Sequence, residues 1–132
     1  MPVHVETVSA PSEQDRIDLS RIYQDAPGWL LPPHASAGGL IESALASGQL
    51  IAGRFNDRLL GAALLQPDET GWRLSHLCVR GITRQRGVGR RIIEEARRRA
   101  EAAGQSLHLC APTEHQEVRA LAARMQLTLA PL

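Results

Sequence analysis

The stretch Thr83–Gly104, TRQRGVGRRIIEEARRRAEAAG, constrains the fold most, because two glycines and several arginines stand directly before an amphipathic helix. The strand-like segment Trp72–Arg80 precedes this loop, and a second strand-like segment, Ser106–Ala111, follows the helix. A strand-loop-helix-strand order forms a crossover unit, so these two strands are expected to be parallel. Apolar residues of the helix recur at three- and four-residue spacing, which predicts one buried face: Ile92, Ile93, Ala96, Ala100 and Ala103.

The N-terminal part of the sequence predicts two helices separated by a loop. Ser12 is expected to cap the first helix, which lies in the segment Ser12–Ala26, with Asp15 three residues on as in a weaker capping box. Three prolines and three glycines predict that Pro27–Gly39 is a loop with no continuous element. A short helix then ends at Gly48, since glycine suits the position after a helix C-terminus.

Two strands and a last helix complete the expected elements. Gln49–Phe55 and Arg58–Gln66 are predicted to pair as a hairpin, with a tight turn at Asn56–Arg58. Glu114–Met125 has apolar residues at helical spacing and predicts the last helix. The expected fold class is therefore α/β, with a mixed central sheet flanked by helices in a single domain, residues 1–132.

Charge and composition narrow the classes of partner. The net charge is +1, yet eight of the 15 arginines lie between Arg80 and Arg99, so the local field there favours an anion. Nucleic-acid binding through this cluster would rest on charge alone. The sequence has no run of about 18 apolar residues and no signal-peptide pattern, and two cysteines, Cys78 and Cys110, fit a reducing compartment. We expect a cytoplasmic protein with neither a nucleic-acid nor a membrane partner.

The glycine loop can bind a diphosphate at the helix N-terminus. The first amides of a helix have no intrahelical partner, and the helix dipole adds about half a positive charge there. Gly87 and Gly89 carry no Cβ and would let an anion approach those amides, while Arg84, Arg86 and Arg90 flank them. A Walker loop needs a lysine, which the chain lacks, and the dinucleotide fingerprint needs a third glycine. A pyrophosphate site is favoured over a glycine turn before a solvated helix.

The pattern Arg84-x-x-Gly87-x-Gly89 at a strand-to-helix junction resembles the acyl-CoA signature of the GNAT superfamily. The resemblance implies acetyl-CoA as cofactor and a pair of parallel strands that splay around it. It also implies that the pantetheine arm binds backbone groups of the preceding strand, at Leu77, Cys78 and Val79. The CoA pyrophosphate would bind the loop itself: Thr83, Arg84, Gln85, Arg86, Gly87, Val88, Gly89 and Arg90.

Three segments resemble the PanZ/PanM group of GNAT-fold proteins more closely: Ser12–Tyr23, Arg54–Ala62 and Val79–Glu95. Members of that group bind acetyl-CoA and dock on the zymogen of aspartate 1-decarboxylase, whose self-cleavage they promote for β-alanine and pantothenate supply. The resemblance implies Arg54 and Asn56 as partner-binding residues. A tight turn alone would explain Asn56 equally well.

The usual residues for acetyl transfer are incomplete, which leaves the question of enzymatic activity open. Acetyltransferases of this fold commonly use a tyrosine of the last helix as acid and a glutamate of the central strands as base. The only tyrosine here is Tyr23, and Trp72–Val79 carries no carboxylate. His76 is the candidate base because its reference pKa lies near 6.5, although a structural histidine is the alternative. The leading hypothesis is a regulator of the decarboxylase, and the alternative is an N-acetyltransferase for an unidentified amine.

A repeated tripeptide and a proline-rich segment raise two further questions. The sequence His-Leu-Cys occurs at 76–78 and again at 108–110, which would suggest zinc if the two copies converged. Splayed strands would separate them, so no metal is expected. The segment Pro27–Gly48 is left open between a lid on an acceptor cleft and a part of the partner interface.

Overall fold

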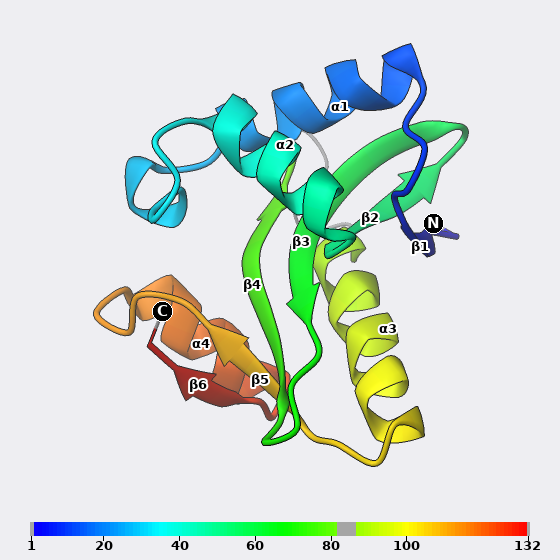
Figure 1. Ribbon diagram of the computed structural model, residues 1–132. Coiled ribbons are helices and arrows are strands. Elements are labelled where there is room, and N and C mark those ends of the chain that lie inside the picture. The colour runs from blue at the N-terminus through cyan, green and yellow to red at the C-terminus, as the bar shows by residue number, and fades with distance from the viewer. Residues whose placement is uncertain (1, 82–86, 132) are drawn as a thin grey trace.

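A computed structural model describes residues 2–81 and 87–131 (Figure 1). Within these residues one six-stranded sheet has the order β1-β2-β3-β4-β5-β6, antiparallel from β1 to β4 and parallel from β4 to β6. The mixed α/β sheet and the parallel pair expected from the sequence are confirmed. The strands are β1 (His4–Thr7), β2 (Leu50–Phe55), β3 (Arg58–Gln66), β4 (Trp72–Val79), β5 (Leu107–Cys110) and β6 (Thr128–Ala130). The helices are α1 (Glu13–Gln24), the 3₁₀ turn η1 (Gly28–Leu30), α2 (Ala37–Ser47), α3 (Val88–Ala102) and α4 (Gln116–Arg124).

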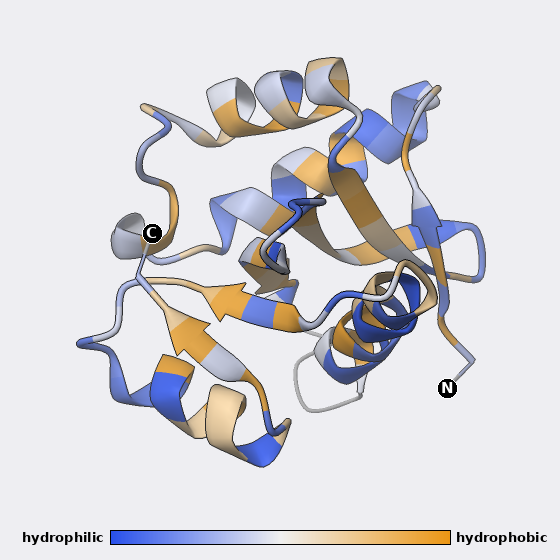
Figure 2. Cartoon of the chain, turned by 60° about the horizontal axis from the view of Figure 1, so that its bottom comes forward, coloured by the Kyte–Doolittle hydropathy of each residue, from blue (hydrophilic) through white to orange (hydrophobic). Residues whose placement is uncertain are grey.

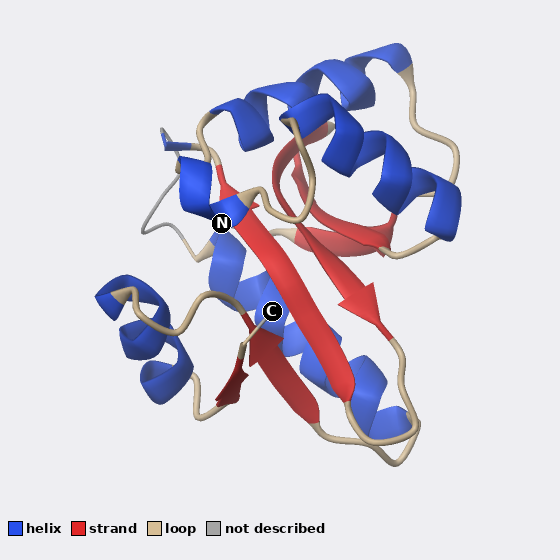
Figure 3. Cartoon of the chain, turned by 60° about the vertical axis from the view of Figure 1, so that its left-hand side comes forward, coloured by secondary structure: helices blue, strands red, loops and turns tan. Residues whose placement is uncertain are grey.

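The helices divide the core into two apolar clusters on opposite faces of the sheet. Helices α1 and α2 lie together against one face, and α3 crosses the other (Figure 3). The α1 side holds Leu19, Ile22 and Tyr23, each almost fully buried. Ile92 and Ile93 anchor the α3 side, which also receives apolar residues of α4. Figure 2 shows strands that are mostly hydrophobic and an α3 that is hydrophobic on one side and hydrophilic on the other. No helix in the described residues has the length and apolar content needed to cross a bilayer.

Two glycines let α3 approach the sheet closely. Gly53 of β2 and Gly61 of β3 are register partners. A Cβ built on either glycine would lie 2.9 Å from a methyl group, Val3 Cγ1 at Gly53 and Val88 Cγ1 at Gly61. Val88 is the first residue of α3 and is buried. The absence of side chains at Gly53 and Gly61 therefore allows the N-terminal end of α3, which follows the glycine loop, to pack closely on the sheet.

The expected loop at Pro27–Gly39 was wrong at its C-terminal end. Helix α2 begins at Ala37 and passes through both Gly38 and Gly39, because Ser36 caps it: the Ser36 hydroxyl accepts a 3.0 Å hydrogen bond from the Gly39 amide. A capping bond satisfies an otherwise unpaired amide and offsets the low helix propensity of glycine. The capping box at the start of α1 is confirmed, with reciprocal bonds between Ser12 and Asp15.

Candidate functional site

Strands β4 and β5 pair at one end and diverge at the other. Their register runs from Trp72 opposite Leu107 to Ser75 opposite Cys110, and β4 then continues to Val79 without β5 beside it. In Figure 1 the two strands meet at the bottom of the view and separate toward the top. The expected splay is confirmed. A cleft of about 960 Å³ opens there between the C-terminal end of β4, the start of α3 and helix α4.

The start of α3 faces this cleft with an uncapped helix end. Gly87 stands at the N-cap with a φ of 86°, a left-handed conformation that favours glycine, and offers no side chain to cap the helix. Gly87, Val88, Gly89 and Arg90 all line the cleft. Amides at such an end attract anions. The other loop residues expected to bind the pyrophosphate, Thr83, Arg84, Gln85 and Arg86, lie outside the described residues.

The C-terminal end of β4 lines one side of the cleft. Leu77 and Val79 are half-buried and pack with the α3-side cluster, whereas Cys78 is buried and packs with the α1-side cluster. The Cys78 thiol donates a 3.3 Å hydrogen bond to the Ile22 carbonyl. All three expected pantetheine-binding residues thus line the cleft, and the backbone of β4 runs along it without a partner strand on the β5 side.

A bulge at His76 shapes the inner end of the wall. The pairing of β3 with β4 shifts between Ala62 opposite Cys78 and Leu64 opposite Ser75, so β4 carries an additional residue there. His76 has a φ of 55°, unusual for a residue other than glycine. The buried Tyr23 hydroxyl donates a 2.8 Å hydrogen bond to the His76 carbonyl and holds the bulge against α1.

Both ring nitrogens of His76 are engaged within the chain. Nε2 lies 2.9 Å from the Pro32 carbonyl, which can only accept, so Nε2 carries the proton. Nδ1 then accepts from the Ser75 hydroxyl, 2.9 Å away. Burial lowers the pKa of His76; the Pro32 bond opposes this, and His34, edge-on at 5.3 Å, adds to it. The ring is held neutral, and its role as a base stays a prediction.

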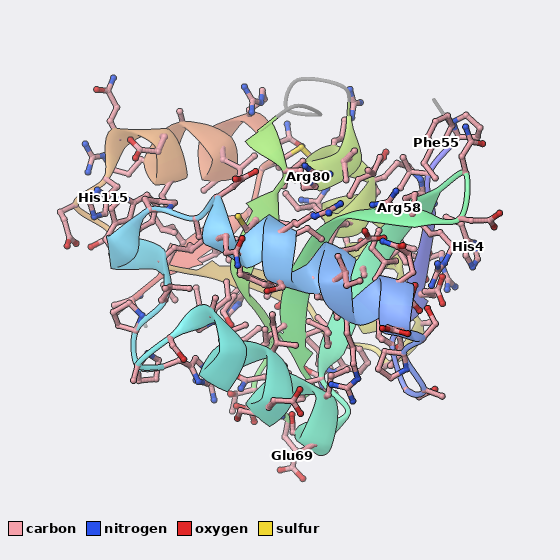
Figure 4. All side chains as sticks on the ribbon, turned by 90° about the horizontal axis from the view of Figure 1, so that it is seen from above. His4, Phe55, Arg58, Glu69, Arg80 and His115 are labelled. Atoms are coloured by element: carbon pink, nitrogen blue, oxygen red, sulfur yellow. The ribbon has the colours of Figure 1, made fainter. Side chains whose placement is uncertain are left out.

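The β2–β3 hairpin is bound to α1 by two arginine–aspartate pairs. Arg54 donates to both Asp15 oxygens, at 3.0 and 3.1 Å, and to Glu6 at 2.7 Å. Arg58 binds the buried Asp18 at 2.7 Å, and Figure 4 shows Arg58 beside α1. The Arg54 guanidinium, expected to bind a partner, thus bonds within the chain, and the hydrogen bonds that it donates to Asp15 and Glu6 raise its pKa above the usual value.

The hairpin tip is exposed and has the conformation of a tight turn. Asn56 and Asp57 have φ angles of 48° and 65°, which asparagine and aspartate tolerate better than other residues with a Cβ. Both residues are exposed. The tight turn expected from the sequence is confirmed, and the Asn56 amide remains available to a partner at the surface.

The two His-Leu-Cys copies do not align in the sheet. His108 lies opposite Arg73 and Cys110 opposite Ser75, so the second copy pairs three residues before the first. Among residues 2–81 and 87–131, no group of three or more potential ligands is placed to hold a metal ion. Burial also raises the pKa of the Cys110 thiol, which disfavours a thiolate.

Arg97 and Trp29 are among the cleft residues that were not identified from the sequence. Arg97 of α3 donates hydrogen bonds to the Met125 and Gln126 carbonyls at the end of α4, and so joins the two helices that border the cleft. Trp29 of η1 also lines the cleft. Only the fold brings these residues to the site: Arg97 is one of several arginines on its helix, and Trp29 lies in the proline-rich segment.

A mixed sheet that splays at β4 and β5 beside an uncapped glycine helix end defines a protein of the GNAT fold. Solved structures agree: N-acetylglutamate synthase of Neisseria gonorrhoeae, complexed with coenzyme A and N-acetyl-glutamate, matches with a TM-score of 0.70 at 19% identity, covering 94% of this chain and 28% of that one. The PaiA N-acetyltransferase of Thermoplasma acidophilum in complex with coenzyme A matches with a TM-score of 0.71 at 12% identity, covering 94% and 88%.

Residues 2–128 match the model of the family described as "Acetyltransferase (GNAT) domain, PanZ", and the chain belongs to that family. Two curated relatives are named PanD regulatory factor. The one from Salmonella typhimurium is 42% identical over 84 residues, which are 64% of this chain and 58% of that protein. The one from Escherichia coli K12 is 36% identical over 87 residues, 66% of this chain and 60% of that protein. The match thus spans about three-fifths of each relative's own length.

Proposed function

We propose that this protein binds acetyl-CoA and, in that state, promotes self-cleavage of the aspartate 1-decarboxylase zymogen. The observation that carries the proposal is the cleft itself, which runs along β4 beyond its last register pair with β5 and ends at the α3 N-terminus, in a chain of the PanZ family. The names of the two curated relatives support the regulatory role. A cytoplasmic location stays a prediction.

The cleft offers a separate environment to each part of acetyl-CoA. The diphosphate would bind the amides at Gly87–Gly89 with Arg90 beside them, because a helix N-terminus favours negative charge. The pantetheine amides would bond with backbone groups along Leu77–Val79, which face the cleft with no strand from β5. These assignments place the acetyl end of the molecule near the His76 bulge.

The hairpin tip is the proposed contact with the zymogen. Asn56 presents an exposed amide on a turn whose conformation is fixed, and a pre-organised group loses little entropy on binding. Arg54 would support this surface chiefly by holding the hairpin on α1, since its guanidinium already bonds Asp15 and Glu6. The N-acetyltransferase alternative gains no support from His76, whose ring nitrogens are both engaged.

The test mixes the protein with the decarboxylase zymogen of the same organism, with and without acetyl-CoA, and follows chain cleavage on a gel. Asn56→Gly keeps a turn with positive φ and removes the amide, so the proposal expects activation to be lost. Asp57→Gly is the matched control and should retain activation. Cleavage that is unaffected by acetyl-CoA and by Asn56→Gly would refute the proposal.

A further inference from the structure

The cleft has a second cavity behind its inner end. This cavity has a volume of about 730 Å³. It is lined by residues of β3 and β4 and by Pro32, Pro33 and His34 of the proline-rich segment. Trp29 and His76 line both the cleft and this second cavity. The two side chains therefore lie at the boundary between the two cavities, which we call the wall. Val79 lies close to Gly89, so His76, three residues earlier on β4, is toward the other end of the cleft.

Trp29 is held in this wall from both sides. Its indole stacks on the imidazole of His115, with ring centroids 4.0 Å apart and planes 16° apart. Figure 4 shows His115 beside η1. Trp29 also packs against both apolar clusters, so it connects the α1 side of the sheet with the loop before α4. A side chain with contacts on both sides has little freedom to leave the wall.

His76 completes the wall and is equally constrained. Its bond to the Pro32 carbonyl ties the bulge of β4 to the segment that carries Trp29. The residue is 4% exposed and burial lowers its pKa, which favours the neutral imidazole, so the wall presents indole and imidazole faces rather than a charged group.

We propose that Trp29, supported by His76 and His115, closes the acceptor end of the cleft, so that a bound thioester is shielded from water and from amines. The inference rests on the proposed binding of acetyl-CoA: a chain running from Gly87–Arg90 along Val79 and Leu77 ends at this wall. A shielded acetyl group is bound without being transferred, as a sensor of acetyl-CoA requires. Excluding solvent from a site is the known means of preventing such side reactions.

The test measures the reactivity of bound acetyl-CoA toward hydroxylamine. The hydroxylamine nitrogen bonds to the acetyl carbon, the carbon–sulfur bond breaks, and the proton lost by nitrogen passes through water to the departing thiolate, giving acetohydroxamate and CoA. Calorimetry first gives the affinity of each variant, and the reaction is then followed by chromatography of CoA with protein in saturating excess. Acetyl-CoA without protein gives the reference rate.

Bound acetyl-CoA should react about tenfold more slowly than free acetyl-CoA in the wild-type protein, because the wall keeps the nucleophile out. Trp29→Ala should bring the rate close to that of free acetyl-CoA while binding is retained. His115→Ala removes the stacking partner at an N-cap position that makes no side-chain capping bond, and should lose part of the protection. Gly28→Ala, where a new Cβ meets no atom within 4 Å, is the matched control and should stay protected.

Each failure has a distinct signature. If the wild-type protein binds acetyl-CoA but leaves it as reactive as the free compound, the proposed shielding by the wall is wrong while the proposed function stands. Full protection in both Trp29→Ala and His115→Ala would have the same meaning. If the wild-type protein binds no acetyl-CoA, both the proposed function and the proposed shielding by the wall are wrong.

Discussion

Gly61→Ala tests whether the close seating of α3 on the sheet determines both stability and the cleft. The new Cβ would lie 2.9 Å from Val88 Cγ1, 3.1 Å from Val79 Cγ2 and 3.2 Å from Ile92 Cδ1. Carbon atoms prefer separations of about 3.5–4.0 Å, so three contacts are too short at once. The two valine methyl groups are fixed by a stiff χ1 and cannot move away without a change of rotamer, whereas Ile92 Cδ1 can rotate about χ2.

The expected cost follows from these distances. Overpacking of a filled core destabilises by about 1–3 kcal/mol, and replacing glycine by alanine returns about 0.4–1 kcal/mol by restricting the unfolded chain. The net free energy of unfolding should therefore fall by about 1–2 kcal/mol, which lowers Tm by roughly 3–8 °C in a chain of this size. Urea and thermal unfolding followed by circular dichroism would measure both quantities.

The same variant should weaken CoA binding, because Val88 follows Gly87 at the helix end that faces the cleft. Gly38→Ala is the matched control: its Cβ meets only Ser36 Oγ, at 4.0 Å, within α2, and it should be neutral or stabilise by up to about 1 kcal/mol. If Gly61→Ala has the same urea midpoint of unfolding and the same m-value as the wild-type protein, the close packing of α3 does not depend on a glycine at this position.

Three further predictions concern hydrogen bonds and charge. Asp18→Asn should lower the free energy of unfolding by about 2–4 kcal/mol in urea, because the buried carboxylate accepts charge-assisted hydrogen bonds from Arg58 and a hydrogen bond from the Leu59 amide of β3. A variant as stable as the wild-type protein would contradict this. Hydrogen bonds from Arg98 and Arg99 lower the pKa of Glu95 from 4.5 to about 2. The contribution of ionised Glu95 to the stability of the fold is therefore complete above pH 4.5 and is lost as the pH falls toward 2. Glu95→Gln should remove that part of the acid dependence, and an identical pH profile would refute the assignment. Tyr23→Phe should cost about 1–3 kcal/mol in thermal unfolding, since the buried His76 carbonyl loses its donor; a cost near zero would mean that the bond holds nothing.

Local patterns in the sequence predicted the elements that carry strong periodicity. The stripe of Ile92, Ile93, Ala96, Ala100 and Ala103 identified α3, although Ala103 follows the last helical residue and is exposed. The order of elements from Trp72 onward predicted the parallel pairing of β4 with β5. Strands β1 and β6 were not predicted, because they have 4 and 3 residues and owe their conformation to pairing with β2 and β5. Short strands at the sheet edges leave little pattern in the chain itself.

The sequence indicated the residues at the cleft that depend on local chemistry and missed those that depend on distant contacts. Gly87 and Gly89 indicate a helix N-terminus suited to an anion from a few consecutive residues, and both line the cleft; their binding of phosphate stays a prediction. Trp29 gains its place only because His115, far along the chain, stacks on it. The local role of Arg54 likewise arises from Glu6 and Asp15, which no spacing rule connects with the hairpin.

Because the pairing of β4 with β5 is short, we expect it to act as a seam between two units, one formed by β5, α4 and β6 and the other by the rest of the sheet and its helices. Four register pairs connect β5, α4 and β6 to the rest of the sheet, aided by the Trp29–His115 stack and the Arg97 bonds. Opening this seam breaks fewer interactions than unfolding the whole chain, so amide hydrogens of β5 and β6 exchange with solvent through a lower-energy route than those of β2 and β3. A ligand that fills the cleft would contact both units and oppose their separation. Hydrogen exchange at β5 and β6 should therefore slow when the ligand is bound, because the C-terminal part of the molecule becomes more rigid.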